Sequence, residues 1–365
     1  MRRRAAEHPC KITRRDARPP RGSTGIDGVS AWYFPASRSP VAATDNKRGV
    51  QDNLPTWTPP IAPRCVLLLC LALLALVAAA TVRAQPIDLI LSEEGGVYDE
   101  VRDVLRQELG GRAELNVLTA AEASSRGSKS DAQLVITVGV QAFEAAARQP
   151  AKSPVLGTLL PRAAYERIVH AADAAARPAT AIYLDQPAAR QLNLVRLVTP
   201  GRDMLGFLVS PQSESMLAPF QAAARDQKLV VTAEQVTASD DLYGALRRLL
   251  GESEVIVALP DSAIFNAGTI VNILITTYRA QEPLFAFSPA YVKAGALAAV
   301  YSSPRQVALE AADWVKRYAA ASPLPAPQYP RQFSVAVNQT VAHSLGINVD
   351  DEATVLDKLR KMEHE

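Results

Sequence analysis

The sequence predicts an α/β protein with two lobes, each built on a doubly wound parallel sheet. Three observations predict this fold. Short β-rich runs alternate with helical patterns from residue 87 onward. These runs are almost continuously apolar, as in MLGFLVS at 204–210, which is typical of parallel strands covered on both faces. The alternation restarts near residue 186, and strand–helix alternation of this kind indicates parallel sheets.

The first unit, 85–185, is predicted to form the first lobe. A helix is expected over 97–111, because apolar residues from Val97 to Leu109 recur at helical spacing and two glycines provide a helix end. A second helix is expected over 141–149. The expected strands are 87–92, 114–118, 134–139, 154–159 and 181–184.

The second unit, 186–294, is predicted to form the second lobe. Its first helix should open at Pro187 and end before Pro200, since proline is tolerated at a helix start and disfavours continuation at its end. The further helices expected are 213–227, 239–252 with Ser239 or Asp240 as its cap, and 262–279. The strands expected are 204–210, 229–236, 255–261 and 284–288.

The stretch PLFAFSPAYVKAGALAAVYSS, 283–303, predicts two short strands joined by a small, close-packed turn. A helix over 304–321, a proline-rich link over 322–330 and a tail helix over 350–363 are expected after it. We expect part of 295–325 to join the first lobe, and 326–365 to supply a returning strand and C-terminal helices. Two similar units and a returning segment predict a bilobed protein whose ligand lies beyond the carboxyl ends of the strands.

The N-terminal part of the chain differs from the rest. Residues 66–82, VLLLCLALLALVAAATV, form an uncharged apolar run that follows Arg64 and leads to Val82-Arg83-Ala84. This pattern predicts a signal peptide over 64–84, cut after Ala84, and hence a periplasmic location; the alternative is an uncleaved membrane anchor formed by 65–82. Residues 1–63 are basic and rich in proline and glycine, which predicts a disordered extension. A start codon further downstream would explain that extension, and a cytoplasmic basic tail is the alternative.

Removal of the first 84 residues would change the charge and the cysteine content. That segment holds 13 of the 39 basic and 5 of the 37 acidic residues, so 26 basic and 32 acidic residues remain, a net charge of −6. Nucleic-acid binding therefore has no electrostatic support. All three cysteines, Cys10, Cys65 and Cys70, also lie in that segment, which excludes a disulfide, a thiol nucleophile or a cysteine metal site in the remainder.

No pattern in the chain indicates an enzyme or a cofactor. The sequence lacks the nucleophile-elbow, dinucleotide-binding and P-loop motifs. Its histidines, at positions 8, 170, 343 and 364, have no partner at a spacing typical of a metal site. We therefore expect no catalytic activity, no metal and no cofactor.

The candidate binding residues lie where strands end and helices begin. Free backbone N–H groups at a helix start can bind a carboxylate or another anion, although simple helix capping explains the same residue types. The candidates are Ser92, Glu93, Gly139, Val140 and Gln141 in the first lobe, and Ser210, Asp261, Ser262, Ser288 and Tyr291 in the second. For Glu93, a charge placed to favour a helix dipole is the alternative reading.

Four stretches in the second half of the chain resemble a known family. They read QPAARQLNLVRLVTPGRDMLGFLVSP, SDDLYGALRRLLGESEVIVALPDS, LFAFSPAYVKAGALAAV and FSVAVNQTVAHSLGI. They are similar to the periplasmic substrate-binding proteins of ABC transporters, in the subfamily linked to tryptophan and related aromatic amino acids. The segment VKAGALAA and the N-x-x-x-A-x-x-L-G pattern from Asn338 to Gly346 are the most specific pieces, and the resemblance covers most of 87–348.

The resemblance implies a bilobed protein with hinge crossovers that closes on a small solute. It also implies that an ABC permease is the partner of this protein. The solute implied is an amino acid or another small carboxylate, and we expect a monomer. The small residues at 294–299 would lie where the lobes pivot. Tyr291 would either stack on a flat ligand in the cleft or pack in the core. Ser288-Pro289 stands where the family often has an acidic pair, so only a hydroxyl is left for a ligand amino group.

Two alternatives to transport remain at this point. The same fold could act as a sensor or accessory binding protein that works through a protein partner. An enzyme on a similar bilobed scaffold is disfavoured by the lack of a catalytic constellation.

Overall fold

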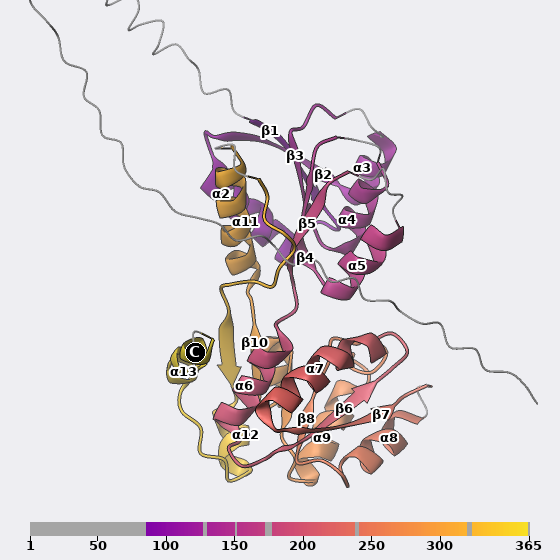
Figure 1. The fold of residues 1–365 in the computed structure, drawn as a ribbon, viewed down its shortest axis with the longest axis vertical. Coiled ribbons are helices and arrows are strands. Elements are labelled where there is room, and N and C mark those ends of the chain that lie inside the picture. Colours follow the sequence, from indigo (N-terminus) through magenta and orange to yellow (C-terminus); the bar gives the residue numbers. More distant parts are fainter. Residues whose placement is uncertain are drawn as a thin grey trace, which may run out of the picture. The chain divides into compact units, whose positions relative to one another are not determined.

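The structure is a computed structural model of the chain. It describes residues 85–126, 130–149, 152–171, 177–237, 241–319 and 323–363 (Figure 1). The predicted extension over 1–63, the predicted signal over 64–84, the two proposed caps Ser239 and Asp240, and His8 and His364 lie outside the described residues.

The first lobe is built on a five-stranded sheet in the order β2-β1-β3-β4-β5, and all of its strands are parallel. Buried apolar and β-branched side chains fill the central strands β3 and β4, which is why the sequence forms a sheet covered on both faces, whereas the edge strand β2 is only partly buried. The strands are β1 (Gln85–Leu91), β2 (Ala113–Thr119), β3 (Leu134–Val138), β4 (Val155–Leu160) and β5 (Ala179–Tyr183).

Helices cover both faces of this sheet, as the doubly wound prediction requires. One buried cluster joins one face to α2 and α11, and a second joins the other face to α4 and α5. Helix α11 comes from far along the chain, yet it packs beside α2 (Figure 1). The helices are α2 (Gly96–Leu109), α3 (Ala120–Arg126), α4 (Val140–Ala147), α5 (Arg162–Ala171) and α11 (Pro304–Ala319).

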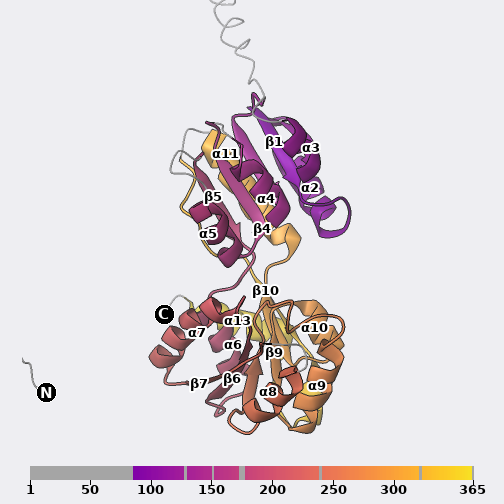
Figure 2. The ribbon, with the colours of Figure 1, turned by 90° about the vertical axis from the view of Figure 1, so that its right-hand side faces the viewer.

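The second lobe is built on a six-stranded sheet in the order β11-β10-β9-β8-β6-β7 (Figure 2). Its strands pair in parallel except β11, which is antiparallel to β10. The strands are β6 (Met204–Val209), β7 (Val230–Gln235), β8 (Val255–Val257), β9 (Leu284–Ala286), β10 (Ala298–Tyr301) and β11 (Ser334–Val337).

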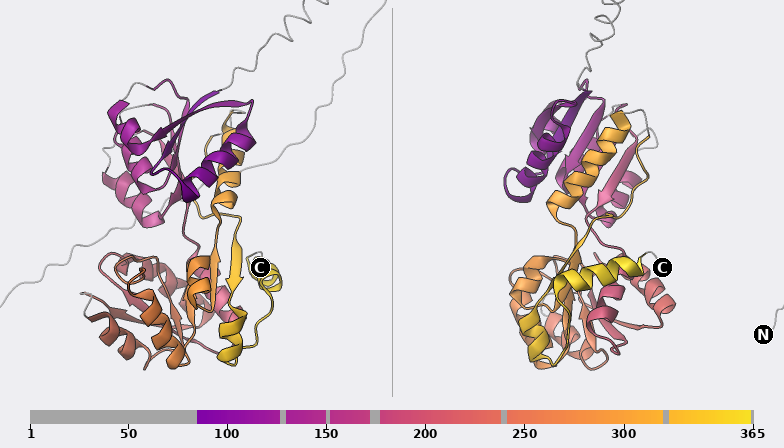
Figure 3. Two further views of the ribbon diagram at one scale, coloured as in Figure 1. Left: turned by 180° about the vertical axis from the view of Figure 1, so that it is seen from behind. Right: turned by 90° about the vertical axis from the view of Figure 1, so that its left-hand side faces the viewer.

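Two buried clusters again lie on opposite faces of the sheet. One joins it to α6, α7, α12 and α13, and the other joins it to α8, α9 and α10 (Figure 3). The helices are α6 (Ala188–Val198), α7 (Glu214–Gln227), α8 (Leu242–Leu249), α9 (Ile270–Arg279), α10 (Pro289–Ala294), α12 (Gln339–Ser344) and α13 (Glu352–Met362). The predicted α/β fold with two doubly wound lobes is confirmed.

Several local predictions are wrong. The helix expected over 262–279 begins only at Ile270, because turns around Asn266 and Gly268 interrupt the first part. The strand expected over 255–261 ends at Val257, and the N-cap of α8 is Asp241.

The stretch 283–303 does not contain a tight turn. Its two strands, β9 and β10, are parallel neighbours, so a crossover must join them, and α10 supplies it. Gly295 ends α10 with φ of 129°, a conformation that favours glycine. Ala298 and Ala299 are fully buried in β10. These small residues therefore pack inside the second lobe, and the expectation that they lie at a pivot is wrong.

The chain passes between the two sheets three times. It leaves β5 for α6, leaves β10 for α11, and returns from α11 to β11. We call the three connections the connecting segments: 184–187, 302–303 and 330–333. Before the last of them, Gln328 still pairs with Ile182 of β5. These connections are the only covalent links between the two sheets within the described part of the chain.

Candidate functional site

The first-lobe candidates gather at the carboxyl ends of β1 and β3. The backbone N–H of Ala142 donates to the Ser92 hydroxyl at 3.0 Å, so this serine joins the loop after β1 to the first turn of α4. Gly139 lies between β3 and α4 with φ of 91°. A Cβ at this position would lie 2.5 Å from Ser92 Oγ and 2.9 Å from the Tyr98 ring. Only glycine fits this turn, for both conformational and steric reasons.

The helix start beside Ser92 exposes backbone donors. Val140 and Gln141 are the first residues of α4, where N–H groups have no intrahelical acceptor. The Ser92 hydroxyl keeps its own proton to donate to a ligand, because it accepts from Ala142. Glu93 is exposed in the adjoining loop. Burial, and then the charge of Glu93, raise the pKa of Tyr98, so its phenol stays neutral at ordinary pH.

The second-lobe candidates form a buried hydrogen-bonded group at the ends of β6 and β8. The hydroxyls of Ser210 and Ser213 donate to one carboxylate oxygen of Asp261, at 2.5 Å and 2.6 Å. The N–H of Ala263 donates to the other oxygen at 2.9 Å. Asp261 is only 4% exposed. Burial acts to raise its pKa, but the donors from Ser210, Ser213 and Ala263 together lower the pKa below its ordinary value.

An aromatic group lies near the same strand ends. The Tyr291 hydroxyl donates to the carbonyl of Phe265 at 2.9 Å, and burial raises the pKa of this phenol. The ring centroids of Phe287 and Tyr291 lie 4.9 Å apart, and those of Phe265 and Phe287 lie 6.4 Å apart. Ser288 is the N-cap of α10 and makes no side-chain capping bond. Phe287, Ser288 and Tyr291 are each partly buried, so part of each side chain reaches the surface.

The structure thus brings the predicted residues together in two sets, one in each lobe. The first set is at the ends of β1 and β3, and the second is at the ends of β6, β8 and β9. Ser262 is exposed, and its carbonyl accepts from Asn266 at 2.9 Å rather than joining the buried group.

Sequence reasoning missed three residues of these sets. Tyr98 falls within the helix expected over 97–111 and carries no signal of its own, so only its packing on Gly139 reveals its place. Ser213 could have been found from its place at the start of the expected helix 213–227, because serine is common at an N-cap; here its hydroxyl accepts from the Ser210 N–H at 3.0 Å. Phe287 was read as part of a strand, with no signal that it would follow the strand end.

Within the described ranges, two other kinds of site are not found. No group of three or more histidine, cysteine, aspartate or glutamate side chains is arranged to hold a metal ion. Among the helices of the same ranges, none is long and apolar enough to cross a membrane.

Residues 101–359 match the family described as ABC transporter substrate binding protein, a match that runs from α2 of the first lobe to α13 of the second. The chain belongs to this family. Its members bind solutes, and the arrangement of two α/β lobes agrees with that role. No curated protein matches the sequence.

Solved structures of low sequence identity share the fold. A substrate-binding protein with adhesive properties from Clostridium difficile, in its ligand-free, open form, has a TM-score of 0.62 at 14% identity and covers 73% of this chain and 97% of its own. An ABC domain in complex with L-Trp from Streptococcus pneumoniae has a TM-score of 0.54 at 16% identity, covering 75% and 98%. A conserved domain protein from Vibrio cholerae has a TM-score of 0.53 at 19% identity, also covering 75% and 98%.

Proposed function

We propose that this protein is a periplasmic receptor that captures a small solute between its two lobes and delivers it to an ABC permease. The family match over residues 101–359 is the observation that carries the proposal, because it spans both lobes and names the binding role. Binding acts by stabilising the closed arrangement, in which one solute contacts both lobes at once. The family match supports binding rather than the enzyme alternative, because the family is described by substrate binding.

The solute is a small carboxylate with a flat apolar body, such as an aromatic amino acid. Its carboxylate accepts from the Ser92 hydroxyl and from the N–H groups at the start of α4, where the helix dipole favours an anion. Its apolar part packs on Phe287 and Tyr291 of the second lobe. The tryptophan complex of the Streptococcus pneumoniae domain supports this class of solute, as does the subfamily resemblance of the sequence.

The first experiment measures binding by thermal shift and calorimetry. L-Trp and related aromatic amino acids are compared with tryptamine, which lacks the carboxylate, and with aliphatic amino acids. A true ligand at a hundred times its dissociation constant stabilises the folded protein by about 2.7 kcal/mol. We expect L-Trp or a close relative to do so and tryptamine to fail. A flat response over the whole panel would overturn the receptor proposal.

A matched pair of variants then tests the site. Ser92→Ala removes the hydroxyl that we place against the solute carboxylate, and it should weaken binding about ten-fold, because a hydrogen bond to a charged group contributes about 1.5 kcal/mol or more. Ser125→Ala removes a hydroxyl that bonds only to the Ala121 carbonyl within α3, so binding should not change. Equal affinities in both variants would remove Ser92 from the site.

Delivery and export are tested separately. Cells that lack the gene should take up the solute slowly, and the gene should restore uptake. Binding without any effect on uptake would favour a sensor or accessory role through a protein partner. N-terminal sequencing of the protein from the periplasm should give Gln85 as its first residue, and a larger membrane-bound form would favour an anchor instead.

A further inference from the structure

A buried arginine lies where the connecting segments enter the second lobe. The Arg190 side chain, in the first turn of α6, is only 7% exposed. Its guanidinium donates to Gln186 Oε1 at 2.6 Å and to the Pro330 carbonyl at 3.0 Å. It also forms an ion pair with Glu363, the C-cap residue of α13, through two nitrogens. One side chain thus joins the first segment, the third segment and the C-terminal helix.

Hydrogen bonds extend this group to the second connecting segment. The Gln186 amide donates to the Ser302 hydroxyl at 3.0 Å. Ser302 in turn donates to the Gln332 carbonyl at 2.5 Å. The chain Glu363–Arg190–Gln186–Ser302–Gln332 therefore contacts all three connecting segments, and we call it the hinge network.

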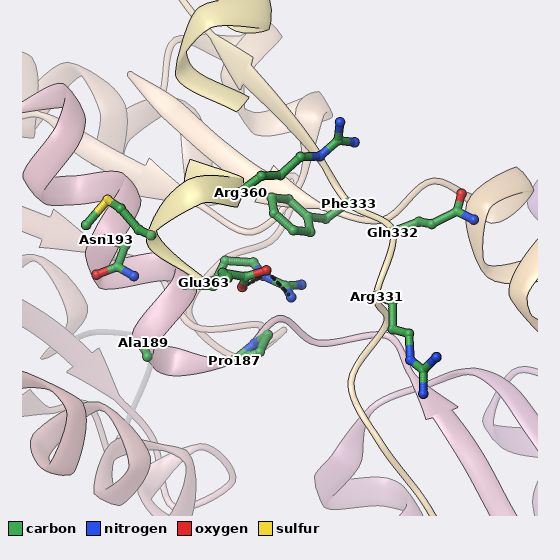
Figure 4. Close-up of a pocket in the computed structure, with 10 residues that line it drawn as sticks. Pro187, Ala189, Asn193, Arg331, Gln332, Phe333, Arg360 and Glu363 are labelled. Atoms are coloured by element: carbon green, nitrogen blue, oxygen red, sulfur yellow. Dashed lines mark hydrogen bonds and ion pairs between the residues drawn. The ribbon is translucent and has the colours of Figure 1, made fainter. Parts of the chain in front are cut away.

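The residues around Arg190 bury its guanidinium, whereas its ion-pair partner Glu363 remains partly exposed to solvent. Its guanidinium lies 3.9 Å from the centre of the Phe333 ring, and Arg360 lies 5.8 Å from that centre (Figure 4). A cavity of about 800 Å³ opens beside these residues and is also lined by Glu363, whose side chain is 25% exposed. A carboxylate at the C-terminal end of a helix is disfavoured by the helix dipole, and the cation of Arg190 offsets that effect.

The neighbouring residue in each segment is bonded to the first lobe instead. Asp185 accepts from the N–H of Arg162 in α5 at 2.5 Å. Ser303 caps the start of α11, where its hydroxyl accepts from Gln306 N–H at 3.2 Å. The N–H of Arg331 donates to Glu310 of α11 at 2.9 Å. In the first two segments, the residue bonded to the first lobe is therefore next to a residue of the hinge network. In the third segment the two kinds of bonding interleave, because Pro330, bonded to Arg190, and Gln332, bonded to Ser302, flank Arg331.

We propose that Arg190 and Glu363 are positioning residues of the hinge, and that lobe motion is confined to the junctions 185–186 and 302–303 and to residues 330–332. The hinge network holds the second-lobe ends of the segments as one unit, so rotation occurs where bonding changes from one lobe to the other. This inference rests on the proposed function, in which the lobes close on a solute. Loss of Glu363 would leave a buried cation without its partner and free the network.

The test measures the distance between the lobes without any ligand. Spin labels are placed on exposed alanines of each lobe, Ala121→Cys in α3 and Ala222→Cys in α7, in the full chain with its three native cysteines replaced by serine. Glu363→Gln should broaden the distance distribution measured by double electron–electron resonance. Asp357→Asn is the matched control, because it breaks an exposed ion pair with Lys361 on the same helix. Its distribution should equal that of the unmodified protein.

A second variant guards against misfolding of the first. Ser302→Ala breaks the link between Gln186 and Gln332 without leaving a charge unpaired, and it should broaden the distribution to a smaller extent. Where a solute is known, Glu363→Gln should also change its apparent affinity about five-fold or more, since the hinge equilibrium is coupled to binding. Unchanged distributions in both variants would overturn the hinge assignment, even if solute binding is established. Failure of every solute would overturn the receptor proposal and leave the distance measurement valid.

Discussion

The carboxyl group of Glu282 should make the stability of the second lobe depend on pH near neutrality. This side chain is only 7% exposed, just before β9. Burial raises its pKa from the ordinary value of 4.5 to about 7, although a hydrogen bond from Ser253 at 2.8 Å and the charge of Arg202 act to lower it. Between about pH 4.5 and 7, Glu282 is therefore protonated in the folded protein but mostly ionised in the unfolded chain.

The sign and size of the effect follow from this difference. The free energy of unfolding should fall as pH rises through this window, and the total loss is at most about 3 kcal/mol. Glu282→Gln removes the titration while keeping the shape of the side chain. Relative to the unmodified protein, this variant should gain stability steadily from about pH 5 to 7 and no further above that.

The assay is urea denaturation followed by circular dichroism at about pH 5, 6, 7 and 8. Glu252→Gln serves as the control, because Glu252 is exposed in the turn after α8, next to Ser253. Its stability difference from the unmodified protein should stay within about 0.5 kcal/mol at every pH. A constant difference between Glu282→Gln and the unmodified protein over the whole range would refute the argument that burial holds the proton on this group.

Three further changes test the local geometry. Gly139→Ala should destabilise the first lobe by about 2 kcal/mol or more in thermal denaturation, because it combines a strained φ with a steric clash. Gly201 has a similar φ, but no atom lies within 4 Å of the new Cβ, so Gly201→Ala should reduce stability by only about 1 kcal/mol. Asp261→Asn should lower the free energy of unfolding by about 2 kcal/mol at neutral pH. Because the pKa of Asp261 is lowered in the folded protein, this loss of stability should shrink as pH falls below about 4. A loss of stability that is independent of pH would contradict the role given to the charge of Asp261. Ala299→Leu should lower the free energy of unfolding by about 1–3 kcal/mol, because the buried position would be overpacked. Ala290 is exposed, so Ala290→Leu should leave stability nearly unchanged. Equal melting temperatures of the two variants would contradict the buried position of Ala299.

The layered fold could be predicted from the sequence because its signals are local. Runs such as MLGFLVS are apolar throughout, so they fit only strands covered on both faces, and β6 occupies this stretch. The start of α9 could not be predicted, because Ile264 and Phe265 continue the helical spacing while a turn at Gly268 breaks the helix. The spacing of apolar residues along the sequence indicates which residues are buried. A turn with buried residues, such as 264–268, can therefore show the same apolar spacing as a buried helix.

The candidate site was predictable only in part. Ser92, Gly139 and Asp261 follow strands, and the topology of parallel sheets predicts their edge. Which side chains meet at that edge depends on tertiary packing. Tyr98 packs on Gly139 from another element, and Arg190 reaches Glu363 from the far end of the chain, so no local pattern could show either contact.

The first lobe is completed by α11, which follows the second-lobe elements from α6 to β10 in the chain. A ribosome must therefore synthesise residues up to about 319 before the earliest strands can bury their apolar side chains against this helix. Contacts of such long sequence separation form slowly. If the protein is exported, this order of synthesis delays folding of the nascent chain and keeps it loose enough to pass through a narrow translocation channel.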